Sequence, residues 1–150
     1  MSARDNRTFD RFGTLVAHTA RQWRRAVDRE LQAYGLTEAT WLPLLHVARA
    51  GAPMRQKDLA ASLALDTSSV VRLLDALEKA GMIERRADAA DRRAKDLVLT
   101  RRGQATVAKV ETVSARIRRD VLAGLSAADL ATATRVLDHV CLQLAGTEPA

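Results

Sequence analysis

The hydrophobic pattern of this chain changes its period near Gly81, and the change constrains the fold more than any other feature. Before that glycine, apolar residues recur every three or four positions, which predicts short helices over 56–63 and 66–80. After it, residues 82–86 and 96–100 alternate as strands do, and the polar stretch between them predicts a hairpin. Two helices, a turn and a hairpin are the order of a winged helix-turn-helix.

Longer helical patterns lie on both sides of this motif. The first covers residues 8–34, and about 27 residues at a rise of 1.5 Å each give roughly 40 Å, more than one small subunit needs for its own core. A second follows it before the motif, and two more cover 103–122 and 127–144. We therefore expect a mainly α fold with a minor β part, organised as one domain over residues 1–150.

Four residues mark the predicted ends of these helices. Gly35 follows the first helix at the position where glycine favours a left-handed turn. Thr37, Asp66 and Ser126 each precede an apolar helical pattern and are residue types that cap helix N-termini.

Composition excludes several other classes of protein. The 150 residues are 47% hydrophobic and 28% charged, which suits one globular core. No apolar run reaches the roughly 18 to 20 residues that span a bilayer, and the first twelve residues lack the apolar stretch of a signal peptide. With a single cysteine, the chain cannot form an internal disulfide. We expect a cytoplasmic protein.

The net charge of +6 is unevenly distributed along the chain. Between Arg85 and Arg102, seven basic residues stand against three acidic ones, which indicates a polyanionic partner such as nucleic acid. A solvated charged face is the alternative interpretation of the same run.

The second helix of the motif has one apolar and one polar face. The spacing places Val70, Leu73, Leu74 and Leu77 on the core side. The opposite side is suited to the DNA major groove, since a helix N-terminus favours a phosphate and an arginine reaches base edges. The predicted DNA contacts of this helix are Ser68, Ser69, Arg72 and Lys79. An ordinary surface helix remains the alternative.

The predicted hairpin adds a second DNA contact. Its loop is too short and too charged to pack, so we expect it to project, with Arg93 entering the minor groove, where the negative potential is strongest. Asp91 is placed to orient that guanidinium through a charge-assisted hydrogen bond. The other predicted contacts of the hairpin are Arg85, Arg92 and Lys95. A solvated loop with incidental arginines is the alternative.

No catalytic or metal-binding pattern is evident in the sequence. His18, His46 and His139 fall in three different predicted helices without further ligands at metal-binding spacing. No Ser-His-Asp, paired-carboxylate or phosphate-loop motif is present, so we expect neither an enzyme nor a cofactor. Cys141 lies on the apolar side of the last helix, where we expect a buried, inert thiol.

The segment from Ser68 to Gly103 resembles the recognition helix and wing of the MarR family, and specifically its SlyA-like branch. The most specific part is the wing sequence DRRAKDLVLT at 91–100. The stretches LTEATWLPLLHVARAG and QKDLAASLAL resemble the second and third helices of the family, and Trp23–Asp28 resembles part of its first. The resemblance covers residues 8 to 144.

This resemblance implies an obligate homodimer, in which residues 8–50 and 103–146 form the dimerisation domain and residues 51–102 the winged helix-turn-helix. Such a dimer would read a pseudo-palindromic operator as a repressor or anti-silencer. It also implies release from DNA by a small aromatic acid bound between the two parts. The candidate pocket residues are His18, Arg21, Trp23, Trp41 and Leu45. For both tryptophans, plain core packing is the alternative.

One different class of function is compatible with the same fold. A winged helix can serve as a protein- or metabolite-binding module without specific DNA binding. The arginines at 92 and 93 favour DNA, because a protein-binding wing more often exposes apolar residues.

Overall fold

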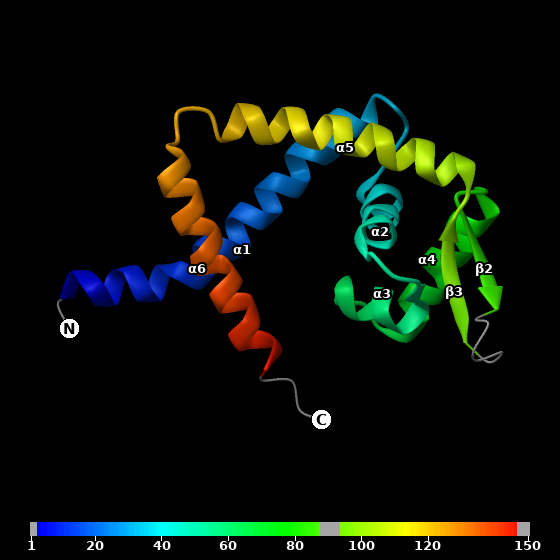
Figure 1. The fold of residues 1–150 in the computed structure, drawn as a ribbon, viewed down its shortest axis with the longest axis horizontal. Coiled ribbons are helices and arrows are strands. Elements are labelled where there is room, and N and C mark those ends of the chain that lie inside the picture. Colours follow the sequence, from blue (N-terminus) through cyan, green and yellow to red (C-terminus); the bar gives the residue numbers. More distant parts are fainter. Residues whose placement is uncertain (1–2, 88–93, 147–150) are drawn as a thin grey trace. The chain divides into compact units, whose positions relative to one another are not determined.

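In the computed structural model, which describes residues 3–87 and 94–146, six helices and a small sheet account for most of the chain (Figure 1). The helices are α1 (Ala3–Gln32), α2 (Glu38–Arg49), α3 (Gln56–Ser62), α4 (Thr67–Lys79), α5 (Arg101–Val121) and α6 (Ala127–Ala145). The strands are β1 (Met54–Arg55), β2 (Ile83–Ala87) and β3 (Lys95–Leu99). This confirms the predicted mainly helical fold with a winged helix-turn-helix.

The sheet contains one strand that the sequence did not predict. β2 and β3 pair antiparallel, with Arg85 opposite Leu97, and β1 adds to the other side of β3, with Met54 also opposite Leu97. The sheet order is therefore β1-β3-β2. A strand of two residues is too short to show alternation, which is why the pattern around Met54 gave no signal.

The helix ends follow the predicted residues with one difference. The side chains of Asp66 and Ser126 accept backbone hydrogen bonds from residues three positions on, as N-caps do. Thr37 occupies the N-cap position of α2 but its side chain makes no capping bond. Gly35 has a φ of +69°, which confirms the left-handed turn after α1.

The chain divides into two compact units, Met1–Ile117 and Arg118–Ala150. The first unit holds two apolar clusters. One lies among α2, α3, α4 and the sheet, and the other joins α1, α2 and α5. Leu44 belongs to the first cluster and Leu45 to the second, so α2 contributes adjacent residues to both.

A tight joint connects the wing to α5. The backbone N–H of Thr100 donates to the Met82 carbonyl at 3.1 Å, and the Thr100 hydroxyl donates to the Gly81 carbonyl at 2.6 Å. The same hydroxyl oxygen accepts from the N–H of Gly103 at 3.1 Å. A Cβ atom at position 103 would lie only 2.0 Å from the Met82 carbonyl oxygen, so the joint has room for glycine alone.

Apolar side chains remain exposed at both ends of the chain. On α1, Val27 and Leu31 are buried whereas Phe9 is 72% exposed, and Leu15 is also exposed. On α6, no residue is buried. The expectation that Cys141 packs into a core is therefore wrong for this chain, because Cys141 is exposed. A periodic apolar face predicts that a helix has a side to cover, but not what covers it.

Candidate nucleic-acid interface

The helix α4 presents a polar face opposite a buried one. Val70, Leu74 and Leu77 are buried, and Leu73 is half-buried against the same cluster, which confirms the predicted core side. The exposed residues of the other side include Ser68, Arg72, Asp75 and Lys79, with Ser69 half-buried beside them. These side chains are therefore accessible to solvent along one side of the helix.

The N-terminus of α4 is occupied by a carboxylate of the chain itself. Asp66 accepts hydrogen bonds from the Ser69 N–H at 2.8 Å, the Ser69 hydroxyl at 2.7 Å and the Ser68 hydroxyl at 2.6 Å. These bonds, that of the Ser68 hydroxyl first, lower the pKa of Asp66 well below its usual range. The expectation that this helix end favours a phosphate needs correction, since a fixed negative charge already lies there.

Only the base of the wing lies within the described residues. Lys95 begins β3 opposite Ala87 and is exposed. The predicted contacts Asp91, Arg92 and Arg93 lie outside the described residues.

The structure places Arg85 differently from the sequence expectation of a DNA contact. Its side chain is only 17% exposed and is directed at α4, where its Nη2 donates to Asp75. Its Nε lies 3.6 Å from Glu78 Oε2. The neighbouring Arg86 is 64% exposed and pairs with Glu84 of the same strand at 2.8 Å. Alternation along β2 thus directs one arginine to the helix and the next to solvent.

A basic hollow beside the wing was not predicted from the sequence. It has a volume of about 400 Å³ and is lined by Arg55, Gln56, Lys57, Ala94 and Lys95. The pairing of β1 with β3 brings the first three of these residues next to the last two. Since β1 itself gave no sequence signal, no pattern could have joined Lys57 to Lys95.

The five predicted pocket residues differ in exposure. His18 and Arg21 are exposed on α1, and Trp23 is half-buried. Trp41 and Leu45 are buried in the cluster of α1, α2 and α5, and the indole N–H of Trp41 donates to Asp28 at 3.2 Å. For Trp41 the structure supports the core interpretation.

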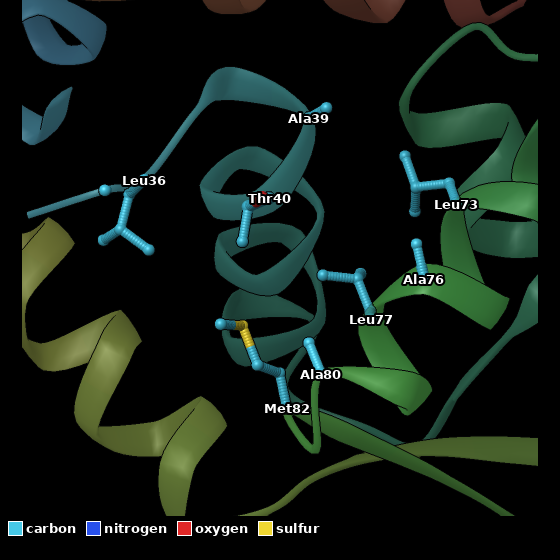
Figure 2. A pocket seen from close by; sticks show the side chains of 9 residues that line it. Leu36, Ala39, Thr40, Leu73, Ala76, Leu77, Ala80 and Met82 are labelled. Carbon is cyan, nitrogen blue, oxygen red and sulfur yellow. The ribbon is translucent and has the colours of Figure 1, made fainter.

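A separate cleft lies between α2 and α4. Figure 2 shows Ala39 and Thr40 of α2 across from residues of α4, with Met82 below them. The cleft has a volume of about 240 Å³, and its α4 wall consists of Leu73, Ala76 and Leu77. The lining is mostly small and apolar, and the volume is below the roughly 300 Å³ at which typical ligand pockets begin.

His46 links α2 to α3 through a defined hydrogen bond. The Ser62 hydroxyl donates to the Leu59 carbonyl at 3.0 Å, so its oxygen accepts from His46 Nδ1–H at 2.9 Å. Burial lowers the pKa of His46, and the positive charge of Arg49 lowers it further. Both effects favour the neutral imidazole, and in that form the Ser62 contact favours the tautomer with its proton on Nδ1.

Over residues 3–87 and 94–146, no three His, Cys, Asp or Glu side chains gather closely enough to hold a metal ion. Within the same ranges, none of the helices combines the length and the apolar character required to cross a membrane.

Comparison with known proteins identifies close relatives. The MarR family model matches residues 34–94. The crystal structure of transcriptional regulator PA3341 is similar to this chain at 41% identity, with a TM-score of 0.83, and the match covers 90% of this chain and 98% of that one.

Two more distant structures share the fold. The S. aureus MepR–DNA complex is 22% identical, with a TM-score of 0.75 and coverage of 89% of this chain and 96% of that one. CouR from Rhodococcus jostii RHA1, bound to p-coumaroyl-CoA, is 24% identical, with a TM-score of 0.75 and coverage of 87% and 92%.

Proposed function

This chain belongs to the MarR family of transcriptional regulators, and we propose on that premise that it binds specific DNA sequences through α4 and the wing. The observation that carries the proposal is the exposed polar face of α4, with Arg72 and Lys79 on it, opposite the apolar face that packs into the core. A B-DNA major groove about 12 Å wide accepts such a helix. The MepR structure contains DNA in its complex, which supports the same use here.

The residues of the interface have different proposed roles. Arg72 reads a guanine edge or holds a backbone oxygen, while Lys79 and Lys95 contact phosphates. Ser68 and Ser69 lie close enough to the helix start to approach base edges, and their hydroxyl protons are directed to Asp66. Asp91, Arg92 and Arg93 remain the proposed minor-groove element, as the sequence predicts.

We further propose that the functional form is a homodimer. Exposed apolar residues lie on α1 and α6, among them Leu15, Val136 and Leu137. A second copy is the occupant that fits, because a two-fold axis would place two recognition helices on half-sites about 34–36 Å apart. The dimer would use the regions 8–50 and 103–146, with the winged part at 51–102, and would act on a pseudo-palindromic operator.

Regulation by a small molecule completes the proposal. We propose a repressor or anti-silencer of the SlyA-like branch that leaves DNA when a small aromatic carboxylate binds, with Arg21 and His18 as the charged and polar partners of the acid. The ligand-bound state of CouR supports a small-molecule effector in this fold. The cleft between α2 and α4 is a second place for such a molecule, since one of its walls is the recognition helix (Figure 2).

Selection of bound duplexes from a random library, followed by footprinting of the enriched sequence, tests the DNA-binding proposal. We expect an enriched pseudo-palindrome and protection of both half-sites. Failure to enrich any sequence at 100 mM salt, with a dimer present, would instead support a protein- or metabolite-binding module.

A further inference from the structure

The base of the wing is fastened to α4 by one arginine and two carboxylates. The side chain of Arg85 on β2 reaches α4, where Nη2 bonds to Asp75 and Nε lies 3.6 Å from Glu78 Oε2. Asp75 and Glu78 are three positions apart, so they lie one above the other on the same side of the helix. One side chain of the wing therefore contacts two successive turns of α4.

The backbone of the wing takes part in the same contact. β2 is an edge strand, because the sheet order is β1-β3-β2. The N–H of Arg85 donates to Glu78 Oε1 at 3.3 Å. Glu78 thus receives both a main-chain amide and the guanidinium of one residue, which fixes the direction of the strand as well as that of its side chain.

The guanidinium is poorly placed to bind anything else. Its Nε is buried, with no hydrogen-bond partner among the described residues. Two carboxylates already surround the charge, so a phosphate would have to displace one of them at a mostly buried position. Arg86, which is exposed and paired only within its own strand, shows that the neighbouring position has a different environment.

We propose that Arg85, Asp75 and Glu78 form a clamp that sets the angle of the wing relative to α4, and that Arg85 is a positioning residue that does not contact DNA. This inference rests on the proposed DNA-binding function. A helix in the major groove and a hairpin in the adjacent minor groove bind together only when their relative orientation is held within about 10–20°. A two-stranded hairpin does not hold such an angle by itself.

The first test compares Arg85→Gln with Arg86→Gln on the selected duplex. Both changes remove one positive charge from the same strand, so long-range electrostatic effects are matched. We expect Arg85→Gln to weaken binding about tenfold more than Arg86→Gln, with the same slope of affinity against salt. Equal affinities would refute the clamp. A slope smaller by about 0.9 for Arg85→Gln alone would identify a phosphate contact and refute it as well.

The second test uses the sign of a charge change. Asp75→Asn removes a negative charge from the DNA-facing side of α4, so simple electrostatics predicts tighter binding. The clamp predicts weaker binding, because Arg85 loses a partner. Asp75 is 60% exposed, so this variant is expected to fold even if Arg85→Gln does not. Tighter binding by Asp75→Asn would overturn the proposal.

A third measurement separates the clamp from the function on which it rests. Hydrogen exchange of the Arg85 amide in the DNA-free protein should be faster in Asp75→Asn than in wild type and unchanged in Arg86→Gln. Unchanged exchange in both variants would refute the clamp without reference to DNA. If wild type showed no preference for the selected duplex over a scrambled one, the proposed function would fail while this exchange result still stood.

Discussion

Replacing Gly103 with alanine should destabilise the protein strongly, although alanine is the better helix former. The added Cβ would lie 2.0 Å from the Met82 carbonyl oxygen, and contacts under 3.0 Å essentially never occur. The obstacle is backbone, and it is held in place by the hydrogen bond from Thr100. We expect a steric cost at the upper end of the range for overpacked sites, about 3 kcal/mol.

Two smaller effects on the free energy of unfolding have opposite signs and nearly cancel, so the expected loss stays about 3 kcal/mol. Displacing Met82 weakens a hydrogen bond worth about 1 kcal/mol, and alanine regains about 1 kcal/mol of helix propensity. A loss of about 3 kcal/mol at this chain length corresponds to a fall in Tm of roughly 6–12 °C. Urea unfolding followed by far-ultraviolet circular dichroism, at a fixed protein concentration, measures the loss.

Gly13→Ala is the matched control for this experiment. It makes the same change inside α1, where an added Cβ would meet no other atom of the same chain within 4 Å. We expect Gly13→Ala to raise the free energy of unfolding by about 0.5–1 kcal/mol. If Gly103→Ala unfolded at the same urea concentration as wild type, the reasoning about the joint between the wing and α5 would be wrong.

Four further predictions concern pH, assembly and DNA contacts. Folding lowers the pKa of His46, so its contribution to the free energy of unfolding should be complete above the unfolded pKa of about 6.5. As the pH falls below that value, the unfolded chain takes up the proton first and stability should decrease. His46→Gln should reduce this decrease, as measured by urea midpoints between pH 7.5 and 5.5. In sedimentation velocity, Leu137→Asp should contain more monomer than wild type at the same concentration, since the change places a charge in the proposed apolar interface. Arg93→Ala should weaken operator binding without changing the melting temperature. Wild-type affinity should fall roughly 10³- to 10⁵-fold between 50 and 200 mM salt if about six to ten phosphates are contacted.

Each of these predictions has an opposite result that would count against it. An unchanged pH dependence in His46→Gln would assign the acid sensitivity to another group. A well-folded wild-type monomer near 16.4 kDa would remove the two-half-site operator along with the dimer. Equal operator affinity before and after Arg93→Ala would exclude the minor-groove role, and a flat salt response would exclude the phosphate-binding surface.

The sequence predicted local features of the fold well, because they depend on neighbouring residues. The core side of α4 and the cap at Asp66 follow from spacing and residue type within one or two helical turns, and both are confirmed. The two long strands were predicted to within one residue. In contrast, β1 exists only through its pairing with a strand about forty positions later, and its two residues carry no pattern of their own.

The candidate interface was less predictable, because the sequence shows where charged residues occur but not which way their side chains are oriented. Arg85 and Arg86 look equivalent as neighbours in a basic run, yet one is directed at α4 and the other at solvent. The same limit applies to Asp66, because its residue type predicts the capping role but not the three hydrogen bonds that hold its charge at the helix start. Cys141 shows the third case, since an apolar helix face is no guide to whether the same chain buries it.

The adjacent residues Leu44 and Leu45 of α2 face two different apolar clusters. This arrangement affects how the protein unfolds and how a protease degrades it. A helix that is a wall of both clusters cannot leave one of them intact while exposing the other. We therefore expect the first unit to open as one cooperative block, with similar exchange protection in α4 and in the C-terminal half of α1. A cellular protease would then meet either an intact DNA-binding unit or a fully opened one, and no truncated fragment would persist to occupy the operator.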